Sequence, residues 1–219
     1  MQKIIIISIL TGFITGCQFP QQKSEFSTKS QPDSLIQSTD KYDIKAYYPK
    51  FEQDATNKVV TGEINKVISD FKSVCEKTPV SDDWNNELYL KTDVSVAKDK
   101  YISVVLSIYQ YAGGAHGNKT CSSMVINVQS NERYYLTDFF NGNVIETIQK
   151  PVRDKLNATL STSEFVDVGT ETLADFSVFS LTDSHITFWF APYQVATYAE
   201  GTQKVSLSIA DLPNFKWPE

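Results

Sequence analysis

The sequence predicts an α+β fold in which helices pack on one face of an antiparallel sheet. Two observations predict it. Apolar residues recur at helical spacing in two segments, and apolar and polar residues alternate in several others. The chain has 219 residues, of which 41% are hydrophobic, enough for a sizeable core. By length, they form one domain or two small ones, and we interpret 42–130 and 131–219 as two intimately joined subdomains.

The first subdomain begins with a strand and a helix. Residues 42–48 alternate well enough to form a strand. A helix follows from Asp54, its predicted N-cap, because one apolar stripe runs along this segment and ends near Cys75, facing the sheet. The stripe consists of Val60, Ile64, Val67, Ile68, Phe71, Val74 and Cys75.

An antiparallel meander completes the first subdomain. Segments 88–97, 101–111 and 122–128 alternate with period two. Lys98-Asp99-Lys100 provides the turn between the first pair. We therefore expect three consecutive strands that pair with one another.

The second subdomain combines a helix with strands. Residues 143–160 return to helical spacing, but Pro151 lacks an amide donor and should kink or split this helix. Segments 176–181, 186–190 and 205–209 are predicted to be strands.

The N-terminus has the pattern of a secretory signal. Lys3 precedes an apolar run that ends at about Ile14, too short for a membrane span of roughly 20 residues. Ile14-Thr15-Gly16-Cys17 resembles the lipobox of bacterial lipoproteins. The resemblance implies removal of residues 1–16 and attachment of palmitate-type acyl chains to the Cys17 thiol, which would anchor the protein to a membrane.

The residues after the cysteine suggest where the protein resides. In Gram-negative lipoproteins an aspartate in this position usually implies retention in the inner membrane, so in a Gram-negative cell Gln18 favours the outer membrane, facing the periplasm. Residues 17–41 are rich in Gln, Ser, Thr and Lys and have few periodic apolar positions. We expect them to form a flexible tether.

Charge and motifs limit the possible functions. The chain carries 20 basic and 26 acidic residues without a lysine or arginine cluster, which argues against a nucleic-acid partner and fits a cationic one. The sequence motifs of serine hydrolases, zinc proteases, P-loops and dinucleotide-binding folds are absent. Either histidine, His116 or His185, could pair with Asp138 or Asp183 in space, but no spacing indicates it. We expect no cofactor and no catalysis, with a cell-wall hydrolase as the competing class.

The other two cysteines, Cys75 and Cys121, form an even pair in an exported chain, so we predict that they form a disulfide. Two unrelated buried thiols are the alternative. A metal site is not expected, because only His116 and His185 could join the cysteines and no ligand spacing is present.

The loop around Gly113, Gly114 and Gly117 admits two interpretations. The glycines could supply positive φ angles for a wide connection between strands. Alternatively, they allow a partner to approach the backbone closely, while His116 and the neighbouring tyrosines offer hydrogen bonds and aromatic surface. The residues alone leave both open.

Three motifs resemble one family. Residues 109–116, Tyr-Gln-Tyr-Ala-Gly-Gly-Ala-His, are similar to a tyrosine-rich strand that runs into Gly-Gly-Ala-His in the extracellular domain of lysozyme-sensing anti-sigma factors, shared with the N-terminal region of some peptidoglycan deacetylases. Residues 136–140 resemble its Leu-x-Asp-x-Phe motif, and 192–201 its Pro-Tyr-x-Val-Ala-Pro-Tyr-Ala-x-Gly motif, with Thr197 in place of a proline. The resemblance covers about residues 42–212.

The resemblance implies a single fold made of both subdomains, which in the anti-sigma factors binds lysozyme. The chain has neither the sigma-binding segment of those sensors nor room for a deacetylase domain, so we expect a stand-alone binding module on a lipid anchor. Its predicted partner is a lysozyme-like muramidase, a host lysozyme or a rival's cell-wall toxin, which it could also inhibit. Peptidoglycan or another glycan is the alternative ligand. The predicted binding residues are Tyr109, Tyr111, Gly113, Gly114, Ala115, His116, Gly117, Tyr193 and Tyr198.

Overall fold

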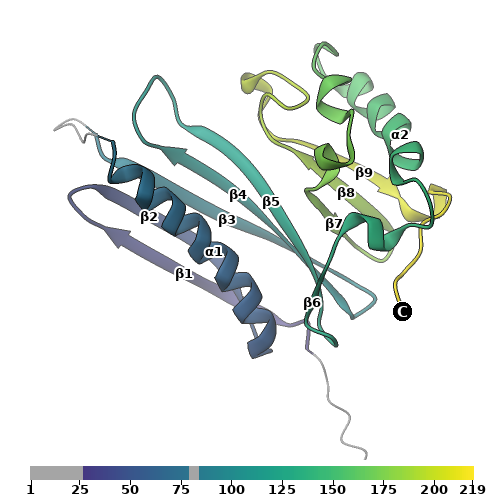
Figure 1. Cartoon of the computed structure of the whole chain (residues 1–219), viewed down its shortest axis with the longest axis horizontal. Helices are drawn as coiled ribbons and strands as arrows, with labels where there is room; N and C mark the ends of the chain where they lie inside the picture. Colours follow the sequence, from purple (N-terminus) through teal and green to yellow (C-terminus); the bar gives the residue numbers. More distant parts are fainter. Residues whose placement is uncertain (1–26, 79–83) are drawn as a thin grey trace, which may run out of the picture.

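The computed structural model describes residues 27–78 and 84–219, which form a six-stranded sheet, a three-stranded sheet and two α-helices (Figure 1). The predicted α+β class is confirmed. The predicted signal peptide, Cys17 and the first part of the tether lie outside the described residues. None of the helices in the described part of the chain has the length and hydropathy that a membrane crossing requires.

The large sheet contains its strands in sequence order. The strands are β1 (Ser30–Ser38), β2 (Tyr42–Phe51), β3 (Asn86–Ala97), β4 (Tyr101–Tyr111), β5 (Asn118–Asn127) and β6 (Glu132–Tyr134). The predicted meander corresponds to β3, β4 and β5. However, β2 and β3 pair in parallel, so the prediction of a purely antiparallel sheet is wrong at this pair. The chain passes through a helix between these strands, and such a crossover returns it in the same direction.

The tether predicted for residues 17–41 is too long, because residues 30–38 of this segment form strand β1. β1 pairs with β2 along its length, from Ser30 opposite Phe51 to Ser38 opposite Asp43. The composition of this segment did not indicate a strand, because an edge strand that is mostly exposed needs few apolar residues. Ile36 is 64% exposed, and only Leu35 packs against the core.

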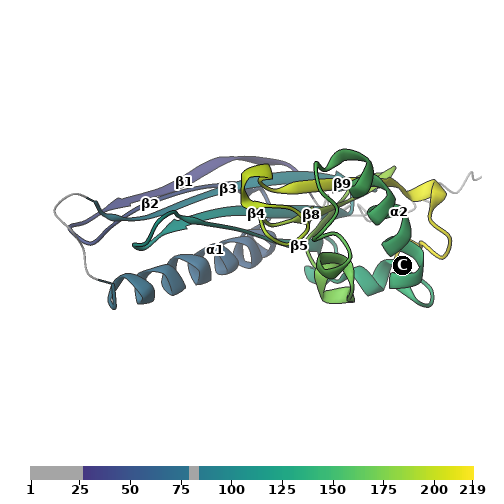
Figure 2. The ribbon, with the colours of Figure 1, turned by 90° about the horizontal axis from the view of Figure 1, so that it is seen from above.

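Helix α1 (Asp54–Cys75) covers one face of the large sheet (Figure 2). Most of the predicted stripe is buried against the strands, although Val74 is 46% exposed. Asp54 is the first helical residue and not the N-cap, which is Gln53. The Gln53 amide donates instead to the Val128 carbonyl, 2.8 Å away, and thereby ties the start of the helix to the end of β5.

The C-terminal half contains α2 (Val144–Thr159), β7 (Phe179–Leu181), β8 (His185–Phe190) and β9 (Gln203–Ser208). α2 runs continuously through Pro151, so the proline does not split it. β7 starts later than predicted, because Phe176 ends the short 3-10 helix η3 (Leu173–Phe176). Buried aromatic side chains dominate this second core. They include Phe139, Phe176, Phe179, Phe188 and Phe190.

The small sheet stands with one edge against the face of the large sheet that is opposite α1. β7 is an edge strand, and its Phe179 and Leu181 amides donate to the hydroxyls of Ser123 in β5 and Ser103 in β4, at 2.9 and 3.0 Å. Two serines thus satisfy backbone donors that an edge strand would leave unpaired. The predicted single sheet with helices on one face is therefore corrected to two sheets, and β6 places the end of the large sheet beyond the predicted boundary at residue 131.

Candidate binding site

Strand β4 carries two of the predicted binding residues on the uncovered face of the large sheet. Its even-numbered residues point into the core beneath α1; these are Ile102, Val104, Leu106 and Ile108. Because side chains alternate along a strand, the odd-numbered residues point the other way. β7 covers the first of them, but Tyr109 and Tyr111 lie beyond it and are only half-buried.

The loop between β4 and β5 contains three glycines with two different roles. Gly113 and Gly114 adopt φ angles of 85° and 97°, which residues with side chains rarely adopt. These two glycines therefore supply the positive φ angles of the connection between the strands. Gly117 permits a close approach instead. A Cβ atom added there would lie 2.2 Å from Cε2 of Tyr109, so the backbone approaches a ring of the protein itself.

The C-terminal motif meets this loop. The Tyr198 hydroxyl donates to the Gly117 carbonyl at 2.9 Å, although 81 residues separate them. The ring centroids of His116 and Tyr198 lie 4.7 Å apart, and those of Tyr193 and Tyr198 5.4 Å. Loop and motif therefore form one aromatic cluster.

The cluster borders a cavity of about 580 Å³, which we call the loop site. It is lined by Trp84, Asn85, Glu87, Tyr109, Tyr111, Ala115, His116, Gly117, Lys119 and Tyr198. Six of the nine predicted binding residues are among them. Of the other three, Gly113 lies beneath Trp84, Gly114 forms the exposed loop tip, and Tyr193 is 58% exposed beside Tyr198.

Sequence reasoning missed four residues of the loop site: Trp84, Asn85, Glu87 and Lys119. The Trp84 ring packs edge-on against Tyr111, with centroids 5.4 Å apart. Strand alternation would have placed Glu87 on the face of Tyr89, since 87 and 89 have the same parity. Lys119 is opposite Tyr109 in the β4–β5 register, which the sequence alone does not determine.

The electrostatics of the loop site suit recognition by hydrogen bonds and aromatic contact. Burial raises the pKa of Tyr109, and the negative charge of Glu87 raises it further. The Tyr109 hydroxyl therefore stays protonated and can donate a hydrogen bond. The Lys119 ammonium lies 5.6 Å from the centroid of the Tyr198 ring, at cation–π distance.

The predicted disulfide is wrong. Cys75 is on the buried face of α1, whereas Cys121 in β5 points to the other side of the sheet, where its Sγ lies 3.9 Å from the Trp189 carbonyl. Both thiols are free, and the large sheet lies between them. Burial raises the pKa of Cys121 to about 11.

The carboxylates considered as histidine partners bind backbone amides. Asp138 accepts from the Tyr135 amide at 2.7 Å, and Asp183 from the Lys98 amide at 2.6 Å. His185 Nδ1 lies 2.8 Å from the Ser184 hydroxyl, and His116 belongs to the loop site. Within residues 27–78 and 84–219, no three His, Cys, Asp or Glu side chains form a group that could hold a metal ion.

The remaining motif residues position the aromatic cluster. The Gln194 amide donates to the carbonyls of Gly169 and Asp175, at 3.2 and 2.9 Å. A Cβ at Gly169 would lie 1.8 Å from the Gln194 carbonyl oxygen, so this close contact requires glycine. It fixes the turn that presents Tyr193 and Tyr198.

Comparisons with known proteins match two regions of the chain. Residues 36–119 match the family described as deacetylase PdaC, and residues 137–210 match the family of unknown function DUF3298. A DUF3298-family structure from Bacteroides fragilis covers 85% of this chain and 94% of its own, with a TM-score of 0.56 and 15% identity. A second, from Pseudomonas aeruginosa, has the same coverage and TM-score at 13% identity. These structures share the fold. No curated protein matches the chain.

Proposed function

Because the chain joins a PdaC-type region to a DUF3298 region, as the sequence motifs suggested, we propose that it is a non-catalytic binding protein of the cell envelope that recognises a lysozyme-like muramidase. One observation carries the proposal. The loop and the C-terminal motif, each predicted to bind, meet in the loop site through the Tyr198–Gly117 hydrogen bond.

The composition of the loop site supports a protein partner. Tyrosine and tryptophan rings bury large contact areas at low entropic cost, and such residues dominate the binding energy of protein interfaces. The tip at Gly114 is exposed, so a partner can contact its backbone. The site can therefore receive a projecting feature of a protein surface.

Net charge favours a cationic partner. The protein has a formal net charge of −6 and a sequence pI near 5.0. Long-range attraction to a basic muramidase would accelerate association more than it slows dissociation. Raising the salt concentration should therefore reduce the association rate first.

Export and lipidation at Cys17 belong to the same proposal, since a muramidase acts outside the cytoplasm. Cys17→Ser should leave the precursor unprocessed and without lipid. Intact-mass spectrometry that finds a mature N-terminus at another residue would refute this part.

Binding is tested by calorimetry of the purified protein against a panel of basic lysozymes. Ala115→Trp adds bulk at the exposed loop tip and should weaken binding by more than about 2 kcal/mol. Ala115 suits this test better than Gly114, because its φ angle is not positive. Ala210→Trp, at an exposed position beyond the far end of β9, is the matched control and should bind as the wild type does. The proposal fails if no lysozyme binds the wild type.

A further inference from the structure

A straight row of side chains crosses four strands and leads from the loop site, which Tyr109 and Lys119 also line, over the open face of the large sheet. Lys45 is opposite Tyr89, Tyr89 is opposite Tyr109, and Tyr109 is opposite Lys119. All four lie on the face of the large sheet opposite α1, so two tyrosines stand between two lysines. At a strand spacing of about 4.8 Å, the row is roughly 14 Å long.

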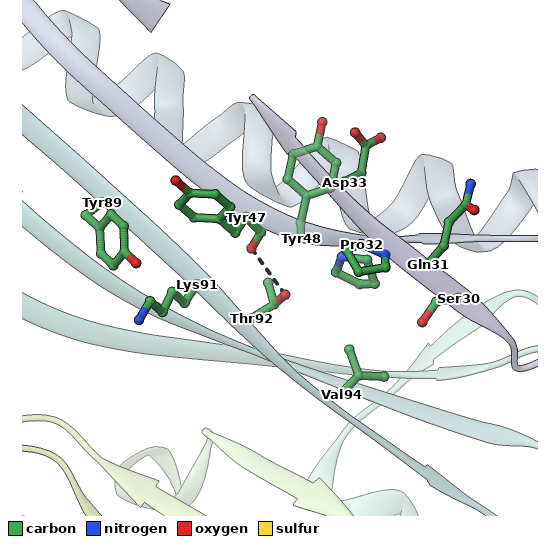
Figure 3. A pocket seen from close by; sticks show the side chains of 11 residues that line it. Ser30, Gln31, Pro32, Asp33, Tyr47, Tyr48, Tyr89, Lys91, Thr92 and Val94 are labelled. Atoms are coloured by element: carbon green, nitrogen blue, oxygen red, sulfur yellow. Dashed lines mark hydrogen bonds between the residues drawn. The ribbon is translucent and has the colours of Figure 1, made fainter. Parts of the chain in front are cut away.

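The row lies in a groove. One cavity of about 450 Å³ contains Lys45, Tyr89 and Tyr109, and another of about 160 Å³ contains Tyr89, Tyr109 and Lys119. A third, of about 620 Å³, extends past Tyr89 to Tyr47, where β2 and β3 separate (Figure 3). All three cavities border Tyr89, and we call them together the tyrosine groove.

Aromatic surface in the tyrosine groove is open to solvent. Tyr47 is 40% exposed, and its ring packs edge-on against Tyr89 with centroids 5.8 Å apart. Tyr89 and Tyr109 are half-buried. The groove thus offers a succession of partly exposed rings, of which Tyr109 also contacts the backbone at Gly117.

The groove also contains lysines without acidic partners. Lys45, Lys91 and Lys119 are exposed, and none of them takes part in the ion pairs of the described residues. Lys91 Nζ lies 5.1 Å from the centroid of the Tyr89 ring. Two carboxylates are nearby. Asp43 and Glu87 both line the cavity of about 450 Å³; Asp43 accepts hydrogen bonds from Ser38 and Asn85, and Glu87 also borders the loop site.

These features favour one class of ligand. The C–H faces of pyranose rings stack on aromatic rings, and a linear glycan places such rings in succession. Ammonium groups that take part in no ion pair attract carboxylates at short range, although the net charge of the protein is negative. An extended peptide adds to an open strand edge, and β2, β3 and β4 are paired on both sides along this row. Of the four strands, only β5 has an open edge here, because β6 pairs with residues 125–127 alone, so a peptide strand could add beside Lys119 but not over the two tyrosines. We infer that the tyrosine groove binds a linear oligosaccharide that bears carboxylates.

Binding is tested with two tetrasaccharides and the full-length protein. One alternates N-acetylglucosamine and N-acetylmuramic acid and therefore carries carboxylates; the other is chitotetraose, which carries none. We expect the first to bind and the second to bind at least about tenfold more weakly. Tyr89→Ala should weaken binding of both about tenfold, whereas Tyr89→Phe, which keeps the ring, should retain most of it. Lys45→Gln with Lys119→Gln should remove the preference for the acidic sugar.

The outcomes separate this inference from the muramidase proposal. Tyr89 does not line the loop site, so Tyr89→Ala should leave lysozyme binding unchanged while it weakens sugar binding, and each proposal can fail without the other. The inference is overturned if neither sugar binds, if Tyr89→Ala has no effect, or if an acidic peptide such as tetraglutamate binds more tightly than the acidic sugar. Circular dichroism of each variant distinguishes lost binding from lost folding.

Discussion

Residues 101–106 of β4 are buried on both faces of the large sheet, whereas among residues 107–111 only Ile108 is buried. α1 covers one face along the whole strand, but the small sheet covers the other face only at the first half. The two halves differ in composition accordingly. Ser103 is the polar residue of the first half apart from the Tyr101 hydroxyl, whereas the second half contains Ser107, Gln110 and two tyrosines. The candidate binding surface is thus the part of the sheet that the C-terminal half leaves uncovered.

The largest expected effect tests whether burial distinguishes the two halves. Leu106 is fully buried beneath α1, so Leu106→Ala should lower the free energy of unfolding by about 2–5 kcal/mol through lost burial and a residual cavity. Tyr111→Ala, at the half-exposed end, should cost less than half as much. Urea denaturation of both variants measures the difference. Equal losses would mean that the open face contributes as much to stability as the core.

The second effect concerns Tyr101, at the covered end of the same strand. Burial raises the pKa of Tyr101 to about 12, and its hydroxyl donates to the Pro218 carbonyl at 2.7 Å. Below pH 10 the phenol is neutral in both states and its contribution is intact. Between pH 10 and 12 the unfolded state ionises first, so stability falls, by roughly 2–3 kcal/mol from this group. Tyr101→Phe should show a shallower decline in denaturation curves recorded across this range.

The third prediction compares alanine substitutions at two glycines. Gly117→Ala places a methyl group against the Tyr109 ring and should lower the free energy of unfolding by about 1–3 kcal/mol. Gly62→Ala, on the exposed side of α1 with no atom nearby, should raise it by about 0.5–1 kcal/mol. Thermal unfolding should therefore shift in opposite directions. Two shifts of the same sign would show that Gly117 does not hold the Tyr109 ring as described.

Local patterns predicted much of the fold. The apolar stripe on α1 and the alternation in β3, β4 and β5 determined both element type and buried face, because these periods reflect local geometry. β1 was missed because an exposed edge strand has no apolar period. The parallel β2–β3 pair was missed because pairing direction depends on where the crossover returns the chain.

The candidate site was predictable only in part. Its tyrosines and glycines stand out in the sequence, and the family resemblance joined the two distant motifs. Trp84 and Lys119 reach the site through sheet register and loop placement, which local patterns do not contain. The cysteines were mispaired for the same reason. An exported chain with an even number of remaining cysteines suggested a disulfide, but only the fold places Cys75 and Cys121 on opposite faces of the large sheet.

The smallest expected effect is none at all, and it concerns that pair. α1 holds Cys75 against one face of the large sheet, and β5 directs Cys121 toward Trp189 on the other, so a bond would require the sheet to open. Adding reductant should therefore leave the melting temperature unchanged, whereas loss of a native disulfide usually costs about 2–5 kcal/mol. Labelling under denaturing conditions without reductant should modify both thiols, and Cys75→Ala should leave Cys121 labelling unaltered. A melting temperature that drops with reductant, or labelling that requires it, would contradict the separation of the two faces.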